Sequence, residues 1–270
     1  MIIREIECKS ILSDTGLPAD YAINCYVGCE HGCRYCYARY MKRFTGHREP
    51  WGTFVDVRMN APEVLEREVG RKPPGSVILS SVCDGWQPLE ATYEVSRRCI
   101  EILTQQNWHV SILTKNCLVR RELPLLEGKP SDIGVTLTTL DERLRRIIEP
   151  KASPTVERIE VLREAAERGI SIWVFLGPFL PMLTDSEENI ASLLAAVASL
   201  PLTHMHTDRV NFRSGVASSL KQMAARHFPD LVDEYRWLGS DGGQDEAYAD
   251  QLQFRISRLA DEYGLSEKLT

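Results

Sequence analysis

Four cysteines within twelve residues form the densest group of reactive side chains in this 270-residue chain. They are Cys25, Cys29, Cys33 and Cys36. The last three have the spacing C-x3-C-x2-C, and thiolates are soft ligands that suit zinc or iron–sulfur clusters. Gly28 and Gly32 lie in the same stretch, and glycine admits the backbone angles that let a tight loop direct three sulfurs at one centre. Three ligands on a four-iron cluster leave one iron open for a substrate or cofactor.

A structural zinc site is the alternative use of these thiols, with Cys25 or His31 as the fourth ligand. A closed zinc site usually pairs C-x2–4-C with a distant second half. The remaining cysteines are instead scattered singly, at Cys8, Cys83, Cys99 and Cys117. The spacing therefore favours an iron–sulfur cluster over zinc.

Composition and charge exclude several classes of protein. With 43% hydrophobic and 26% charged residues, the chain is neither collagen-like nor of low complexity nor wholly disordered. Its net charge of −6 disfavours binding to nucleic acid or acidic lipid by bulk charge. Residues 228–270 hold ten acidic and four basic side chains, so residues 1–227 balance to zero. We interpret the acidic stretch as a solvated helical cover.

The sequence indicates a cytoplasmic chain that does not enter a membrane. Residues 1–10 include Arg4, Glu5, Glu7 and Lys9 and lack the apolar core of a signal peptide. The longest apolar stretch, 170–183, is interrupted by glycine and proline and is too short to span a bilayer. Thiols stay reduced in the cytoplasm, so eight cysteines indicate metal binding or catalysis rather than disulfides.

Short runs rich in β-formers alternate with helical patterns along the chain. We predict strands at 21–27, 77–82, 110–113, 133–138, 172–176 and 205–210. We predict helices at 62–69, 92–105, 154–168, 186–199, 215–227 and 245–263, with a loop at 239–243. Ser186 is expected to cap the fourth helix, and Gly169 to end the third. The alternation predicts an α/β fold with a parallel sheet, either an incomplete barrel or a doubly wound sheet.

The cysteine loop resembles the signature of the radical S-adenosylmethionine (radical SAM) enzymes. The wider phrase, 24–38, is similar to the branch related to spore photoproduct lyase. Further similarities occur in order over about residues 20–185. They are Asp84 with Gln87-Pro88-Leu89-Glu90, Leu113-Thr114-Lys115, Thr136-Leu137-Thr138, Glu149-Pro150, Arg158, and Gly177-Pro178 with Pro181.

The resemblance implies a partial (β/α)6 TIM-type barrel over residues 1–227, with 228–270 as a C-terminal helical extension packed on it. Barrel enzymes keep their chemistry at the C-terminal mouth of the strands. There a [4Fe–4S] cluster would bind SAM and cleave it to methionine and a 5′-deoxyadenosyl radical, which abstracts hydrogen from a substrate that the sequence does not identify. A reducing partner such as flavodoxin or ferredoxin is implied as well.

The same resemblance assigns roles to single residues. Cys29, Cys33 and Cys36 would hold the cluster, whereas Cys25 stands where the family usually has proline. Lys115 would contact the SAM carboxylate, Thr136 matches a serine that holds SAM, and Thr138 stands where a relative has asparagine. Tyr35 or Tyr37 would lie near the adenine. Asp84 matches an aspartate beside a SAM contact. The alternative for Lys115 is a solvated surface lysine, and the alternative for the two tyrosines is simple packing of the loop.

Cys83 is a departure from the family, whose members carry serine or threonine there as a SAM contact. The hydrogen-donating cysteine of spore photoproduct lyase matches Ser81, two residues earlier and on the same face if a strand continues. Cys83 is therefore interpreted as a SAM contact, a catalytic hydrogen donor, or a small buried apolar residue.

Residues 31–48 combine five basic side chains with interleaved aromatics, which is typical of single-stranded nucleic-acid binding and also suits an anionic cluster. His204, His206 and the run Asn211-Phe212-Arg213 could face the barrel mouth. A radical SAM enzyme is the leading hypothesis. The alternative is a zinc, iron–sulfur or nucleic-acid-binding protein without radical turnover.

Overall fold

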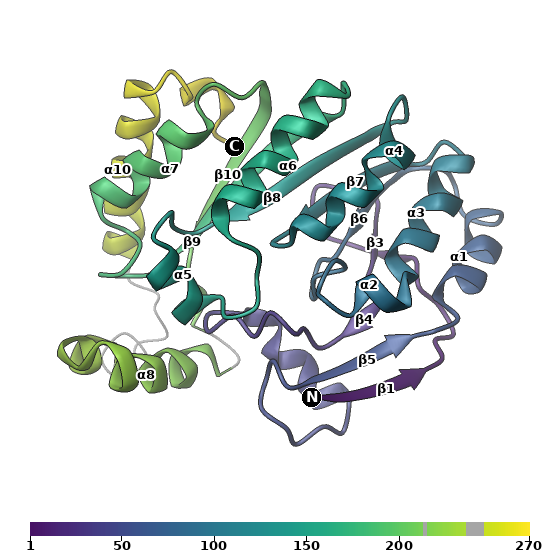
Figure 1. Cartoon of the computed structure of the whole chain (residues 1–270), viewed down its shortest axis with the longest axis horizontal. Coiled ribbons are helices and arrows are strands. Elements are labelled where there is room, and N and C mark those ends of the chain that lie inside the picture. Colours follow the sequence, from purple (N-terminus) through teal and green to yellow (C-terminus); the bar gives the residue numbers. More distant parts are fainter. Residues whose placement is uncertain (213–214, 236–245) are drawn as a thin grey trace.

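The computed structural model describes residues 1–212, 215–235 and 246–270, and these form an α/β fold. Within them a seven-stranded sheet has the order β10-β9-β8-β7-β6-β3-β2 (Figure 1). From β3 to β10 every neighbouring pair is parallel, whereas β2 is antiparallel to β3. The strands are β2 Ser13–Asp14, β3 Tyr21–Ile23, β6 Ser76–Leu79, β7 His109–Thr114, β8 Ser131–Leu137, β9 Ser171–Phe179 and β10 Leu202–Arg209.

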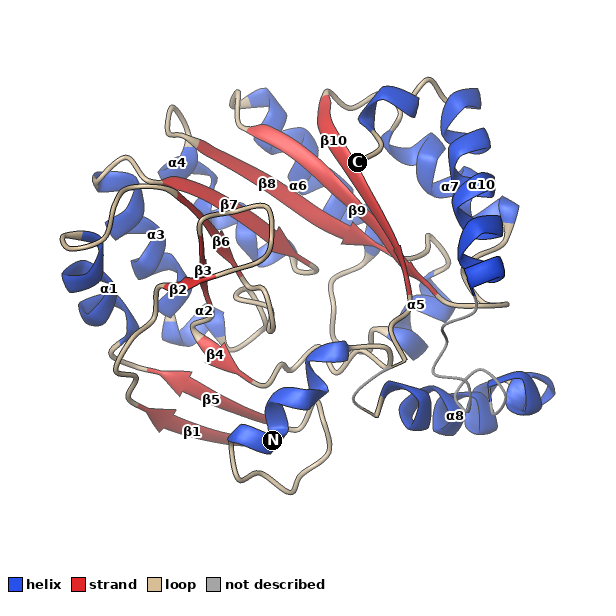
Figure 2. Ribbon diagram, turned by 180° about the vertical axis from the view of Figure 1, so that it is seen from behind, coloured by secondary structure: helices blue, strands red, loops and turns tan. Residues whose placement is uncertain are grey.

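Helices cover one face of this sheet and leave the other open. The α-helices include α1 Ala61–Val69, α2 Glu90–Tyr93, α3 Val95–Gln105, α4 Leu123–Leu126, α5 Glu142–Ile148, α6 Thr155–Glu167, α7 Glu187–Val197, α8 Val216–His227 and α10 Glu246–Glu262, of which α8 lies away from the sheet (Figure 1). Figure 2 shows β6 to β9 from the uncovered side, with α1, α3, α4 and α6 behind them. In β7, Val110 and Ile112 are buried, while Ser111 and Leu113, which point to the opposite face of the strand, are half-buried. Among the described strands β2 and β10 do not pair, so the sheet is a partial barrel, as predicted.

A second, small sheet was not predicted. It has the order β1-β5-β4 and consists of β1 Ile2–Ile6, β5 Phe54–Arg58 and β4 Tyr26–Val27. The predicted strand 21–27 is therefore two strands, because the chain leaves the large sheet after Ile23 and joins the small one at Tyr26. The backbone oxygen of Cys25 accepts from Arg58 N at 3.1 Å at this crossing. The cysteine loop thus starts from the small sheet.

Other local predictions are partly confirmed. Gly169 has φ +72° after α6, and the Ser186 side chain accepts from Asn189 N at the start of α7, as expected for caps. The predicted strand 77–82 is wrong at its end, because β6 stops at Leu79 and Ser80 has φ +80°. The predicted helix 92–105 is interrupted where Glu94 has φ +50°.

The C-terminal part of the chain packs on the rest. Helix α10 lies against α7 (Figure 1) and buries Leu252, Ile256 and Leu259 in the main core. Leu269 forms a bridge with Met205 of β10. The predicted loop 239–243 and the first predicted residue of its helix, Asp245, lie outside the described residues, and the division at residue 228 stays a prediction. Within the described residues no helix is both long and apolar enough to cross a membrane.

Candidate active site

The cysteine loop leaves β4 and folds tightly at the C-terminal end of the large sheet. Gly28 and Gly32 have φ +91° and +61°, conformations that glycine adopts without strain. A Cβ on Gly52 would lie 2.8 Å from the Cα of Gly32, so the loop packs closely against the segment before β5. Cys29 and Cys33 are buried and Cys36 is half-buried.

These three thiols are close enough to influence one another's ionisation. Burial raises the pKa of all three thiols, to about 12 for Cys33. Negative charge on Cys36 raises the pKa of Cys29 and Cys33 further, and charge on Cys33 does the same for Cys29. Lys115 acts in the opposite direction on Cys33 and Cys36. Free thiols here would stay protonated at neutral pH, and a bound metal deprotonates its thiol ligands outright.

The arrangement fits a cluster better than a single ion. In the described part of the chain, no group of three Cys, His, Asp or Glu side chains converges as ligands of one metal ion would. Three cysteines on a four-iron cluster each bind a different iron, so their sulfurs surround the cluster and need not converge on one point. A structural zinc site needs four convergent ligands.

Trp51 offers a donor that fits a cluster thiolate. Its indole Nε1 is buried and has no hydrogen-bond partner among the described residues. Burial raises the pKa of Cys36, and Trp51 is among the groups that oppose this rise, so the indole is near enough to act on the thiol. Hydrogen bonds to cluster sulfurs are one of the ways in which proteins adjust iron–sulfur centres.

Cys25 and Cys83 have different surroundings. The Cys25 sulfur lies 3.7 Å from the Cys99 sulfur, and both residues are buried in the core. The Cys83 thiol donates to the backbone oxygen of Tyr26 at 2.8 Å and is also buried. Because β6 ends at Leu79, Ser81 and Cys83 lie in a loop, and the expectation that they share a strand face is wrong. The role of Cys83 stays a prediction.

Lys115 is a half-buried cation without an acidic partner. It follows β7 directly, and its Nζ donates to Thr136 Oγ1 of β8 at 3.4 Å. Its Nζ also lies 6.0 Å from the centre of the Tyr35 ring. Among the described residues no carboxylate oxygen comes within 4.0 Å of this ammonium. A free cation beside the cysteine loop suits an anionic ligand.

Asp84 and His31 connect the cysteine loop to the end of β7. The Asp84 carboxylate accepts from Thr114 Oγ1 at 2.7 Å and from Lys115 N at 2.8 Å, and it lies 3.4 Å from His31 Nδ1. Burial lowers the pKa of His31 to about 4 despite the opposing effect of Asp84, so the ring is neutral at pH 7. Its Nε2 then accepts from the Asn116 amide at 3.2 Å.

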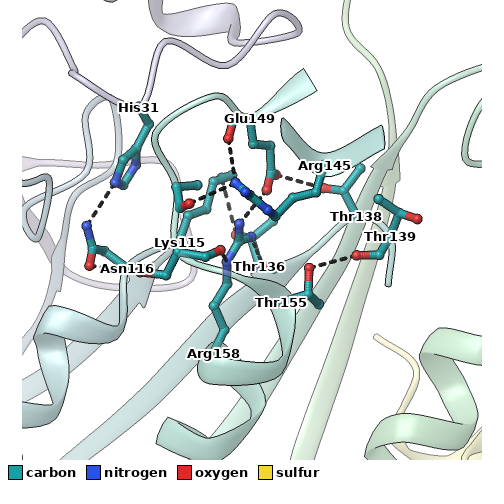
Figure 3. Close-up of polar contacts among 12 residues, drawn as sticks. His31, Lys115, Asn116, Thr136, Thr138, Thr139, Arg145, Glu149, Thr155 and Arg158 are labelled. Carbon is teal, nitrogen blue, oxygen red and sulfur yellow. Dashed lines mark hydrogen bonds and ion pairs between the residues drawn. The ribbon is translucent and has the colours of Figure 1, made fainter. Parts of the chain in front are cut away.

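Glu149 is the centre of a second buried network (Figure 3). Its carboxylate accepts from Arg158 Nη2 at 2.5 Å, from Thr138 Oγ1 at 3.0 Å and from the Tyr35 hydroxyl. The side chains of Glu149 and Arg158 are both fully buried. Arg158 also donates to Thr136 O at 2.8 Å, so the pair joins the cysteine loop to the end of β8.

Other predicted site residues lie further out. Tyr37 is exposed, and its hydroxyl donates to Ser81 O. His204 and His206 pack against Trp173 of β9, with ring centroids 5.1 and 5.5 Å apart. Phe212 is buried in a small cluster that contains Tyr35, whereas Arg213 lies outside the described residues.

Sequence reasoning assigned no role to Trp51, Asn116, Glu149 or Arg158, and it considered His31 only as a zinc ligand. Glu149 and Arg158 appeared among the landmarks, but nothing in their spacing marks a buried ion pair. For Trp51 the only signal was its place just after the basic aromatic stretch.

Comparison with known proteins decides the family of this chain. The family model of the Radical SAM superfamily matches residues 23–194, which include all three motif cysteines. The chain belongs to the radical SAM superfamily. Radical SAM enzymes use SAM with an iron–sulfur cluster, so the chain is an enzyme of this class.

Two relatives and one solved structure give further detail on this radical SAM enzyme. It is 31% identical to an uncharacterized protein of Mycobacterium tuberculosis over 97% of its own length and 81% of the relative. It is 33% identical to an uncharacterized protein of Methanocaldococcus jannaschii, covering 68% of this chain and 70% of the other. Spore photoproduct lyase complexed with dinucleoside spore photoproduct has the same fold, with a TM-score of 0.73 and 15% identity over 99% of this chain and 82% of that one.

Proposed function

We propose that this radical SAM enzyme holds a [4Fe–4S] cluster through Cys29, Cys33 and Cys36. The observation that carries the proposal is the arrangement of these three thiols on one compact glycine loop, beside the unpaired Lys115 ammonium. When bound, the cluster supplies the electron that splits SAM into methionine and a 5′-deoxyadenosyl radical, which takes a hydrogen atom from an organic substrate.

The residues around the loop would bind and orient SAM. Lys115 would pair with the SAM carboxylate, since a flexible ammonium that forms no ion pair with the described acidic residues suits that charge. The Thr136 hydroxyl lies beside it and would donate one hydrogen bond. Tyr37, a residue that is 46% exposed, would lie against the adenine.

Other predicted contacts already have protein partners, which supports a positioning role for them. The Tyr35 and Thr138 hydroxyls both bind Glu149, and Asp84 holds Thr114 and the backbone of Lys115. These bonds would fix the cysteine loop against the ends of β7 and β8. A fixed loop keeps the reacting groups aligned and excludes water.

The test is anaerobic incubation of the reconstituted protein with dithionite and SAM, followed by detection of 5′-deoxyadenosine by mass spectrometry. The parent protein should form 5′-deoxyadenosine, and Cys33→Ala should not. A parent protein that holds its iron and sulfide but forms no 5′-deoxyadenosine above the Cys33→Ala background would overturn the proposal.

A further inference from the structure

The segment that follows the cysteine loop is a basic surface whose cations form no ion pair with the described acidic residues; Arg39 and Lys42 donate instead to backbone oxygens and to the Ser219 hydroxyl. It comprises the 3-10 helix η1, Tyr37–Phe44, and its flanks. Its five cations are Arg34, Arg39, Lys42, Arg43 and Arg48. No acidic residue falls between positions 34 and 48, and the whole chain carries −6, so the rest of the chain carries −11. Among the described residues none of these cations has a carboxylate oxygen within 4.0 Å.

This basic surface is exposed and carries aromatic rings. Arg43, Phe44 and Arg48 are exposed, and Phe44 keeps 66% of its area accessible. The Arg43 guanidinium lies over the rings of Tyr40 and Phe44, at 5.4 and 4.7 Å from their centres. A hollow of about 300 Å³ lies between η1 and the small sheet. Arg4 and Arg58 add two cations to its wall, and Asp56, which binds His47, adds one carboxylate.

The basic surface is also in direct contact with the cysteine loop. Helix η1 starts immediately after Cys36, which is the most exposed of the three motif cysteines. Arg39 Nη2 donates to the backbone oxygen of Cys33 at 2.9 Å. A protein bound over η1 would therefore sit beside the sulfurs that hold the cluster.

We propose that the basic surface around η1 is the docking site of a small acidic electron-transfer protein. The inference rests on the proposed function, because reductive cleavage of SAM takes one electron that must enter through the protein surface. Electron-transfer partners form small, transient interfaces, below about 1,200 Å². Charge complementarity accelerates such encounters and orients them. A short cationic patch on an otherwise acidic chain suits a compact acidic partner better than a long polyanion.

The test uses a bacterial flavodoxin as the probe and the double variant Arg43→Glu/Arg48→Glu, because both side chains are exposed and their replacement leaves the core intact. The matched control is Arg71→Glu/Lys129→Glu, two exposed cations at the opposite ends of the strands from the cysteine loop. With reduced flavodoxin as donor, the η1 variant should need roughly tenfold more flavodoxin for half-maximal 5′-deoxyadenosine formation, and added salt should affect it less than the parent. With dithionite, which needs no docking, the variant and the parent should react equally fast.

Binding of oxidised flavodoxin, measured by calorimetry, separates this inference from the proposed function. If dithionite yields no 5′-deoxyadenosine but flavodoxin binding is lost only in the η1 variant, the proposed function fails and the docking site stands. Equal effects of the η1 and control variants would overturn the docking site. A fluorescent fifteen-nucleotide oligothymidine probes the alternative ligand. If the η1 variant lost binding of this oligothymidine but bound flavodoxin as the parent does, the docking site would be overturned in favour of a site for single-stranded nucleic acid.

Discussion

At the scale of single residues, the four clustered cysteines separate into two groups. Cys25 faces Cys99 in the core, whereas Cys29, Cys33 and Cys36 share a loop beside Lys115. Replacing any of the last three with alanine should abolish the cluster, and Cys25→Ala should retain it. Iron and sulfide are measured after anaerobic reconstitution. Loss of iron in Cys25→Ala with retention in Cys33→Ala would reverse the assignment.

Trp51 leads to a prediction about the electronic properties of the same site. Its buried N–H has no hydrogen-bond partner among the described residues, and Trp51 is among the groups that lower the pKa of Cys36. Trp51→Phe keeps the ring but removes the donor, which should favour the oxidised cluster by about 1 kcal/mol, or roughly 40 mV for one electron. Redox titration followed by electron paramagnetic resonance should show a more negative potential at unchanged iron content. An unchanged potential would mean that the indole does not bind the thiolate.

Lys115 and Thr136 lead to a prediction about SAM affinity. Loss of a charge-assisted contact in Lys115→Ala should cost about 1.5–3 kcal/mol, and loss of a neutral hydroxyl in Thr136→Ala roughly 1 kcal/mol. Calorimetric titration of SAM into the cluster-loaded proteins measures both. Lys129→Ala is the control, since Lys129 is exposed at the other end of β8. If Lys115→Ala binds SAM as tightly as Lys129→Ala, the ammonium has another role.

At the scale of elements, the strand–helix alternation predicted the large parallel sheet because its strands are short apolar runs between helical patterns. The small sheet escaped prediction, since β1 includes Arg4 and Glu5 and is largely exposed. The break between β3 and β4 also escaped, because Asn24 is a single turn-forming residue in an otherwise apolar run from Tyr21 to Val27 and does not by itself mark a change of sheet. The break is caused by the pairing of β4 with β5, a distant segment of the chain, and the local sequence gives no sign of that pairing.

The candidate site was predictable to a similar extent. The cysteine spacing identified the loop, and the resemblance to the radical SAM family identified Lys115 and Thr136, with Lys115 also marked by its place at a predicted strand end. The network around Glu149 was not found, because burial of a charged pair depends on how α6 packs against β8. Glu149 and Arg158 look like ordinary surface charges in the sequence until α6, which carries Arg158, is placed against β8.

The Glu149–Arg158 pair joins three elements, so its removal should destabilise the fold. Arg158→Met strands a carboxylate in the core and should lower the free energy of unfolding by about 3–5 kcal/mol. The double variant Glu149→Gln/Arg158→Met should recover part of that loss. Urea unfolding of the cluster-free proteins at pH 7 measures both values, and a double variant less stable than Arg158→Met would contradict the argument.

The same ion pair makes the stability of the fold depend on pH. Burial raises the pKa of Glu149, but Arg158 and Lys115 outweigh it and hold the pKa at about 2. An unfolded glutamate has a pKa of about 4.3. The stabilisation is therefore complete above that pH and is lost as the pH falls toward the folded value. In the cluster-free protein, Glu149→Gln should reduce the loss of stability between these two pH values.

At the scale of the whole molecule, the open face of the sheet and the acidic C-terminal part lie on different sides. Helices cover the far face of the strands, and α10 adds to that layer by packing on α7 (Figure 1). The C-terminal end returns to the sheet, where Thr270 N donates to Met205 O at 3.1 Å. These contacts indicate that residues beyond 245 unfold together with the barrel rather than as a separate unit.

A matched pair on α10 tests this cooperativity. Ile256 is 2% exposed within the main core, whereas Phe254 on the same helix is 71% exposed. Ile256→Ala should lower the free energy of unfolding of the whole protein by about 2–5 kcal/mol, because it leaves a cavity between α10 and α7. Phe254→Ala should change it by less than about 0.5 kcal/mol. Both values come from urea unfolding followed by circular dichroism. A helix that shares the barrel core cannot lose its packing without weakening that core. If Ile256→Ala instead produced a separate early transition and left the main transition as in the parent protein, residues 246–270 would be an independent folding unit.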